Sequence, residues 1–318
     1  MAAVGFHASH ELYPPSELLR LTRLAQEHGF RHVMCSDHFH PWTPSQGQSG
    51  YAWSWLGAAM QATETTFGTV CAPGQRYHPA IIAQASATLA EMFPERLWVA
   101  LGSGQALSES ITGDPWPPKA QRHARLLESV AVIRALWAGE TVTHEGLIRV
   151  KDAKLYTRPK RPPMIFGAAI SLETAAWVGR WADGLITVAA PQHELKQKVD
   201  AFREAAGADK PVFVQAAISY SPDEEESVRA ARANWPICGL EVSELEDLPT
   251  PQSFAERCCG VTLDVARSRL RSSSNLDQHI EWIAGDLEAG ATRIYLHHVG
   301  PDMDRFVGSF ADRVLPYL

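Results

Sequence analysis

The sequence predicts a single α/β domain, a (β/α)8 barrel that spans residues 1–318. Eight strand-like apolar runs alternate with segments of helical periodicity, a pattern typical of a parallel sheet covered by helices. No linker interrupts this alternation, and over 318 residues it favours a closed barrel. A doubly wound sheet is the alternative, but no Gly-x-Gly-x-x-Gly follows the first strand.

The N-terminal part of the chain supplies the first four strands. A helix is expected from Ser16, a good N-cap, to His28-Gly29, and a later helix begins with Pro79 in its first turn. The expected strands are residues 4–8, around 31–34, 67–71 and 97–101, and the further helices are 52–63 and 79–92.

The C-terminal part continues the alternation with two insertions. A long helix is expected from Pro117, and the alternating stretch 141–150 with its Glu-Gly turn predicts a β-hairpin. Residues 235–271 show no strong period, and we expect an irregular insertion there. The remaining strands are expected at 164–167, 184–188, 212–220 and 293–297, and the remaining helices at 172–181, 195–206, after 223, 276–289 and 302–315.

Composition narrows the class of protein. The net charge is −7 and no basic stripe is visible, which argues against nucleic-acid binding. No apolar run approaches the length of a membrane span, and the N-terminus lacks the positive start of a signal peptide. Five cysteines without a Cys-x-x-Cys pair indicate reduced thiols, a cytoplasmic location and no zinc ribbon.

Polar residues gather where the predicted strands end, most densely at Asp37-His38-Phe39-His40-Pro41-Trp42. By itself this cluster could be a capping Asp, a surface His and a packed Trp. In a barrel, however, the strand ends converge on one site, which favours a functional role. Those ends are Ser9-His10-Glu11, Asp37-His38, Thr69-Val70-Cys71, Ser103-Gly104-Gln105, Gly167-Ala168-Ala169, Thr187-Val188, Ser219-Tyr220 and His297-His298.

Two kinds of chemistry suit such a site. A metal-dependent hydrolase could use His38 and His40, but the ends of strands five to seven supply no His, Lys or carboxylate as further ligands. A flavin-type oxidoreductase needs small residues beside a flat ring and an imidazole that accepts a proton as hydride leaves the substrate. The imidazole pKa near 6.5 suits that role. The small residues available are Gly102, Ser103, Gly104, Gly167, Ala168 and Ala169.

The chain resembles the luciferase-like monooxygenase superfamily. Within it, the similar branch contains the glucose 6-phosphate dehydrogenases that depend on coenzyme F420, a deazaflavin. The matching motifs run in family order over most of the first 220 residues. They are Gly5 to Glu11, Ser36 to Trp42, Ser54-Trp55, Arg76 to Ala85, Gly102 to Glu109, Arg125 to Ser129 and Ile218-Ser219-Tyr220.

The resemblance implies a role for each matching residue. His38 corresponds to the catalytic base, Trp42 flanks the reacting centre, and Glu11 could orient His38 or the substrate. Gln105 occupies the position of the family's acid. The residues implied to contact the cofactor are Asp37, Val70, Cys71, Ser103, Gly104, Ser108, Gly167, Ala168 and Ala169, with a non-proline cis peptide expected within residues 69–71.

Three departures from the branch bear on the substrate and cofactor. Gln105 replaces a Glu, and an amide has no titratable proton to give. The lysine that holds the sugar phosphate has no counterpart in 188–192, and paired glycines become Ala168-Ala169. These changes argue against glucose 6-phosphate. Because residues 73–79 are similar to an FMN-dependent side branch, the sequence favours FMN over coenzyme F420.

We therefore expect a flavin-type oxidoreductase that transfers hydride between a small organic substrate and FMN or a deazaflavin, with His38 as acid and base. The alternatives are an F420-dependent dehydrogenase of another alcohol or sugar, an FMN-dependent monooxygenase, a metal-dependent hydrolase, and a barrel that only binds a ligand. The family resemblance also implies a homodimer.

Overall fold

A computed structural model describes residues 3–318 and confirms the closed barrel. Eight parallel strands form it in the order β9-β11-β1-β2-β3-β4-β7-β8, and the pairing of β8 with β9 closes the ring. The barrel strands are β1 (Val4–Ala8), β2 (His32–Ser36), β3 (Thr66–Cys71), β4 (Leu97–Leu101), β7 (Met164–Ala168), β8 (Gly184–Val188), β9 (Val212–Tyr220) and β11 (Arg293–His298).

Helices surround the barrel, and most lie where the sequence predicts them. The helix expected from Pro117 starts two residues later, after the N-cap Pro118. The helix expected to reach residue 181 ends at Val178, with Gly179 as its C-cap. The outer helices are α1 (Pro15–Glu27), α2 (Ala52–Ala62), α3 (Pro79–Met92), α5 (Lys119–Ala138), α6 (Leu172–Val178), α7 (Gln192–Ala206), α8 (Glu224–Asn234), α12 (Leu276–Glu288) and α13 (Met303–Arg313).

Alternate residues of each strand face the barrel interior, as the pleat of a strand requires. Large side chains fill the lower interior: Trp98, Phe166, Phe213 and Tyr295 contact one another with ring centroids 4.2–5.7 Å apart. The Trp98 indole also donates a hydrogen bond to the Tyr295 hydroxyl at 3.0 Å. This packed floor leaves the C-terminal ends of the strands as the place for a site.

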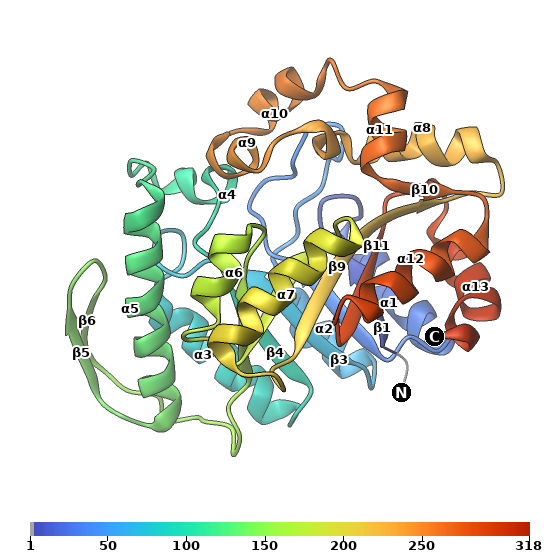
Figure 1. The fold of residues 1–318 in the computed structure, drawn as a ribbon. Coiled ribbons are helices and arrows are strands. Elements are labelled where there is room, and N and C mark those ends of the chain that lie inside the picture. Colours follow the sequence, from blue (N-terminus) through green and yellow to red (C-terminus); the bar gives the residue numbers. More distant parts are fainter. Residues whose placement is uncertain (1–2) are drawn as a thin grey trace.

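The two insertions lie outside the barrel. Strands β5 (Val142–Glu145) and β6 (Arg149–Ala153) form the predicted hairpin. Residues 235–270, which we call the roof, form three short helices that lie above the C-terminal strand ends in Figure 1. They are α9 (Val242–Asp247), α10 (Pro251–Cys258) and α11 (Leu263–Arg269).

The sequence did not predict one further strand, β10 (Arg271–Ser273), which pairs in parallel with the end of β9. Its three residues are too few to show a period. The remaining short elements are α4 (Ala106–Glu109) and the 3-10 helices Ser110–Thr112, Pro236–Gly239 and Leu315–Tyr317. Across residues 3–318, none of the helices combines the length and apolar character that a membrane crossing requires.

Candidate active site

Glu11 and His38 form a hydrogen-bonded pair at the ends of β1 and β2. The His38 Nδ1 atom lies 2.7 Å from Glu11 Oε1, and the hydroxyls of Ser9 and Ser36 each donate to Glu11 Oε2 at 2.8 Å. Because an ionised carboxylate only accepts hydrogen bonds, Nδ1 carries the imidazole hydrogen. The Nε2 atom of His38 is then left with a lone pair that can accept a proton.

Glu11 stays ionised although its side chain is only 1% exposed. Burial alone would raise the pKa of this carboxyl. The hydrogen bond from His38, the nearby imidazoles and the Ser36 hydroxyl outweigh burial and hold the pKa well below its ordinary value. The pair is therefore a base held in one tautomer by a fixed negative charge, the arrangement that proton transfer needs.

Trp42 closes one side of the Glu11–His38 pair. Its ring is nearly perpendicular to the His38 ring, with centroids 5.0 Å apart. On its other side it contacts two residues of the roof, Phe254 at 5.3 Å and Trp235 at 6.1 Å. The indole Nε1 atom is buried and has no hydrogen-bond partner in the part of the chain that the structure describes. The ring of Trp42 therefore adjoins the predicted base and carries an unpaired N–H donor.

Asp37 belongs to a buried charged cluster with Arg76, Tyr77 and Glu109. The Tyr77 hydroxyl donates to Asp37 Oδ1 at 3.0 Å, and the Arg76 amide donates to Glu109 Oε2 at 2.7 Å. The Arg76 guanidinium lies between the two carboxylates, 3.5 Å from Asp37 and 3.4 Å from Glu109. Burial raises the pKa of both carboxyls. Tyr77 and Glu109 were not predicted as site residues, because nothing in their local pattern distinguishes them from core and surface positions.

The two predicted cofactor contacts on β3 point in opposite directions. Val70 packs against the residues that fill the barrel interior, whereas Cys71 belongs to the core between barrel and helices. Strand alternation allows only one of two neighbouring side chains to face inward, so a contact from Cys71 to the cofactor would come from its backbone. The expected cis peptide is wrong, since no peptide bond in the described chain is cis.

The loop after β4 holds Ser103, Gly104, Gln105 and Ser108 beside the strand ends. Gly104 has a φ of +88°, and a Cβ there would lie 2.9 Å from the Glu109 side chain. Gln105 is half-buried and is the N-cap residue of α4. The Ser108 hydroxyl accepts a hydrogen bond from the Phe39 amide at 3.1 Å, so it joins this loop to the β2 loop.

The three predicted contacts at the end of β7 also differ in direction. A Cβ on Gly167 would lie 2.3 Å from Val178 of α6, so this glycine permits helix packing rather than ligand approach. Ala169 packs in the helix layer as well, and only Ala168 faces the interior. A Cβ atom added at Gly102 would lie 3.5 Å from the Cβ atom of Ala168. Two small residues are therefore neighbours at the barrel mouth.

His40 joins the loop after β2 to the backbone of α4. Its Nδ1 atom lies 2.9 Å from the Leu107 carbonyl oxygen. Within residues 3–318, no three His, Cys, Asp or Glu side chains come together in a way that could bind a metal ion. The metal-dependent hydrolase considered from the sequence is therefore not supported.

Comparison with known proteins identifies the family. The model of the luciferase-like monooxygenases matches residues 2–293. The chain belongs to this family. It is an enzyme and an oxidoreductase of the luciferase-like class, as the sequence predicted.

Its similar relatives span the whole chain. The F420-dependent glucose-6-phosphate dehydrogenase of Beutenbergia cavernae is 35% identical and aligns with 100% of this chain and 98% of its own. The enzyme of that name from Mycobacterium tuberculosis is 32% identical, with coverages of 99% and 97%. None of these relatives supports the sequence-based preference for FMN.

One solved structure is similar to this chain in both fold and sequence. It is an F420-dependent secondary alcohol dehydrogenase in complex with an F420–acetone adduct, with a TM-score of 0.92, 32% identity, and coverage of 99% and 98% of the two chains. The monooxygenase RslO1 of Streptomyces bottropensis has a TM-score of 0.73 at 21% identity, which shows a shared fold alone.

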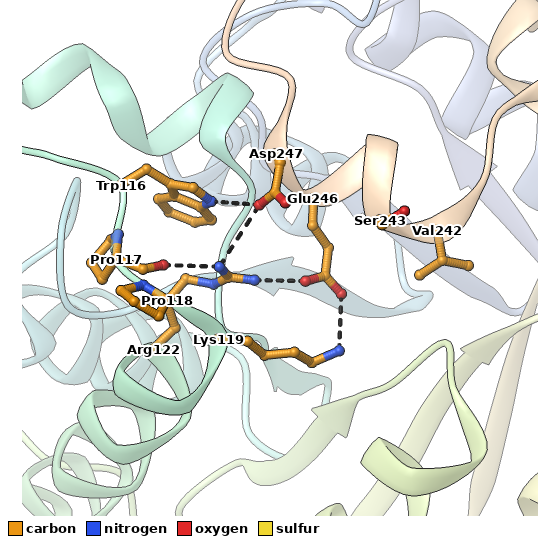
Figure 2. A pocket seen from close by; sticks show the side chains of 9 residues that line it. All are labelled: Trp116, Pro117, Pro118, Lys119, Arg122, Val242, Ser243, Glu246 and Asp247. Atoms are coloured by element: carbon orange, nitrogen blue, oxygen red, sulfur yellow. Dashed lines mark hydrogen bonds and ion pairs between the residues drawn. The ribbon is translucent and has the colours of Figure 1, made fainter.

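A latch fastens the roof to the start of α5. We define it as Trp116, Lys119 and Arg122 on one side and Glu246 and Asp247 of α9 on the other (Figure 2). Arg122 donates to Glu246 at 2.6 Å, Trp116 donates to Asp247 at 3.0 Å, and Lys119 lies 3.2 Å from Glu246. The Arg122 guanidinium also lies 4.4 Å from the Trp116 ring centre. These residues line a cavity of about 650 Å³ at the edge of the roof.

Replacing Arg122 by alanine should loosen the roof. The change removes a guanidinium that is only 3% exposed and leaves Glu246 without its shortest partner. A hydrogen bond to a charged group contributes about 1.5–3 kcal/mol, so amide hydrogen exchange in 242–247 should quicken about tenfold or more. The control is Arg134→Ala, which breaks a more exposed ion pair with Asp183 elsewhere. Unchanged exchange in the Arg122 variant would mean that the latch does not hold the roof.

Buried imidazoles predict that the protein loses stability as the pH falls from about 6.5 toward 4. Burial lowers the pKa of His10, His279 and His297 to about 4 and that of His298 to about 3. In the unfolded chain these histidines take up protons near pH 6.5, whereas in the folded protein they do so only near pH 4 or below. Between these pH values, each such group lowers the free energy of unfolding by up to about 1.4 kcal/mol per pH unit as the pH falls. Urea unfolding between about pH 7.5 and 4.5 measures this slope. His10→Phe should reduce it, and a flat profile would contradict the prediction.

Proposed function

We propose that this enzyme oxidises a neutral alcohol to a carbonyl compound, with the deazaflavin coenzyme F420 as hydride acceptor. The observation that carries the proposal is the Glu11–His38 pair, 2.7 Å apart at the strand ends, with the free Trp42 N–H beside it. Support for the cofactor comes from relatives named for F420 that are 32–35% identical over the whole chain.

The residues at the mouth suit a flat ring. Gly102 and Ala168 have little or no side chain, so a ring could lie directly over the backbone at these positions. Val70 faces the barrel interior, and Gly104 has no side chain that would block a ring. Ser103 is half-buried and can hydrogen-bond a ring edge. These residues would hold the deazaflavin, with the cluster around Asp37 behind them. When bound, the deazaflavin supplies a two-electron acceptor for hydride.

Three side chains of the protein would then act on the hydroxyl proton and the oxygen of the substrate. His38 Nε2 accepts the proton of the substrate hydroxyl as the carbon–hydrogen bond breaks and the carbonyl forms. Glu11 keeps His38 in the accepting tautomer and stabilises the imidazolium that results. The Trp42 N–H donates to the substrate oxygen, where negative charge develops. The amide of Gln105 can donate a hydrogen bond, but it cannot donate the proton that a Glu would.

Two arginines near the mouth are already held by carboxylates, so neither is free to bind a sugar phosphate. Arg76 lies between Asp37 and Glu109. Arg271, whose Nη2 is 3.4 Å from the Ala190 carbonyl oxygen, binds Asp286 through both terminal nitrogens at 2.5 and 2.7 Å. Together with the absence of a lysine from 188–192, this favours an uncharged substrate over glucose 6-phosphate.

A direct test is to titrate the purified enzyme with coenzyme F420 and, separately, with FMN, and then to add secondary alcohols. The expected result is F420 binding and alcohol-dependent loss of the oxidised cofactor's visible absorbance. Uptake of FMN with no F420 binding would overturn the cofactor assignment. Consumption of oxygen with hydroxylated product would favour the monooxygenase alternative.

We also propose a homodimer in the cytoplasm. The family resemblance supports the dimer, and five free cysteines support a reducing compartment. Light scattering of the purified protein measures its mass in solution, and a monomer at micromolar concentration would contradict the dimer. Fractionation of the source cells tests the cytoplasmic location.

A further inference from the structure

Two further imidazoles lie beside the Glu11–His38 pair and have no assigned role. His7 and His297, which we call the histidine pair, occupy neighbouring strands β1 and β11, and their ring centroids are 4.3 Å apart. Their neighbours in sequence, Phe6 and Leu296, pack toward the helices, so alternation places both imidazoles on the interior face. The strand that carries His7 ends at Ala8, three residues before Glu11, and the charges of Glu11 and His38 act on the pKa of both imidazoles.

The histidine pair has hydrogen-bonding atoms without partners. His7 is 2% exposed and His297 is 0% exposed, yet both nitrogens of His7 and the Nε2 atom of His297 have no hydrogen-bond partner among residues 3–318. Nearly all buried polar groups in proteins are hydrogen-bonded, and leaving one unsatisfied costs about 1–3 kcal/mol. Three such atoms at one place indicate that something polar binds there.

The tautomer of His297 follows from its hydrogen bond with Gln215. The Gln215 amide nitrogen lies 3.3 Å from His297 Nδ1, and an amide nitrogen can only donate. Nδ1 therefore accepts, and the free Nε2 atom carries the hydrogen. Burial lowers the pKa of His297 to about 4 and that of His7 well below its ordinary value, so both rings are neutral at pH 7. The pair then presents donors and an acceptor but no charge.

Aromatic contacts connect the histidine pair to the predicted base. His297 contacts Trp235 of the roof at 4.5 Å, Trp235 contacts Trp42 at 6.1 Å, and Trp42 contacts His38 at 5.0 Å. This chain of rings links two sets of polar atoms that have no partner among residues 3–318. One set is at His38 and Trp42, and the other is at the histidine pair.

We infer that the histidine pair binds a second, uncharged hydroxyl of the substrate, which makes the substrate a neutral diol or polyol. The His297 Nε2–H donates a hydrogen bond to the oxygen of this hydroxyl, and the unprotonated nitrogen of His7 accepts a hydrogen bond from the hydroxyl. A neutral imidazole suits a hydroxyl because it offers both a donor and an acceptor. The inference rests on the proposed function, since it concerns the substrate that His38 deprotonates.

The test compares alcohols that differ by one hydroxyl, namely butan-2-ol with butane-2,3-diol and pentan-2-ol with pentane-2,4-diol. With F420-loaded enzyme, kcat/KM should be about tenfold or more higher for at least one diol than for its matched alcohol. The variants His7→Phe and His297→Phe should abolish this preference and leave the simple alcohols within about threefold. His7→Gln, which keeps a donor and an acceptor, should retain part of it.

The matched control is His10→Phe. His10 is also a buried imidazole with both nitrogens unpaired, but it contacts Trp55 of α2 and lies outside the chain of rings. Equal kcat/KM for diol and alcohol in the wild type, or equal losses for both in the pair variants, would overturn the inference and leave the alcohol oxidation standing.

Turnover of none of the alcohols would instead count against the proposed function. In that case the dissociation constants of the same probes, measured by tryptophan fluorescence, decide the inference. Tighter binding of a diol that the His7 and His297 variants abolish supports it, and equal binding of diol and alcohol contradicts it.

Discussion

His38→Ala should lower kcat of the cofactor-loaded enzyme by about 10²–10⁴-fold and leave cofactor affinity within about twofold. The factor is that expected when a positioned proton acceptor is lost. Cofactor affinity should persist because the residues proposed to hold the ring, such as Ser103 and Gly104, belong to a different loop. Steady-state kinetics and an absorbance titration measure the two quantities.

The variant Glu11→Gln distinguishes the contribution of Glu11 to kcat from that of His38. Its amide keeps the shape of the side chain but loses the charge that fixes the His38 tautomer, so kcat should fall less than in His38→Ala and the pH optimum should shift. His40→Ala is the control, because His40 only joins a loop to the Leu107 carbonyl. Full turnover in His38→Ala would remove His38 from the mechanism.

The substitution Gly68→Ala should destabilise the fold by about 3 kcal/mol or more. A Cβ at this position of β3 would lie 1.8 Å from the Trp98 ring, closer than any non-bonded contact. The indole cannot withdraw, because Phe166, Phe213 and the hydrogen bond to Tyr295 hold it in the barrel floor. Overpacking a filled core typically costs about 1–3 kcal/mol, and this site allows little relaxation.

Gly57→Ala is the matched control for Gly68→Ala. It places the same methyl group in the middle of α2, where the nearest atom belongs to Leu89 at 3.8 Å. Alanine in a helix is favoured over glycine by about 0.5–1 kcal/mol, so this variant should be as stable as the wild type or more stable. Urea unfolding of both variants measures the difference, and similar midpoints would contradict our account of the barrel floor.

The sequence predicted the repeating part of the fold well, because each barrel element carries its own local signal. The strands 4–8, 97–101, 184–188 and 212–220 and the helix 79–92 have the predicted bounds. The roof has weaker signals, since its helices are six to eight residues long and their burial comes from contacts with Trp42 and Leu107 far away in the sequence.

The side chains that face the site were harder to predict than the strands that carry them. Among the predicted cofactor contacts on β3 and β7, the side chains of Val70 and Ala168 face inward, whereas those of Cys71 and Ala169 pack toward the helices. A motif gives the position of a strand end to within a residue, but a shift of one residue reverses the direction of every side chain.

By itself, the sequence determined the barrel, the family and the set of residues at the strand ends, since all three follow from local periodicity and contiguous motifs. Tertiary structure alone decided which of those residues meet. It joined Glu11 to His38 from separate strands, enclosed Arg76 between Asp37 and Glu109, and brought His7 against His297 from opposite ends of the chain. The physical reason is closure of the sheet, because the first and last strands become neighbours only when the barrel closes.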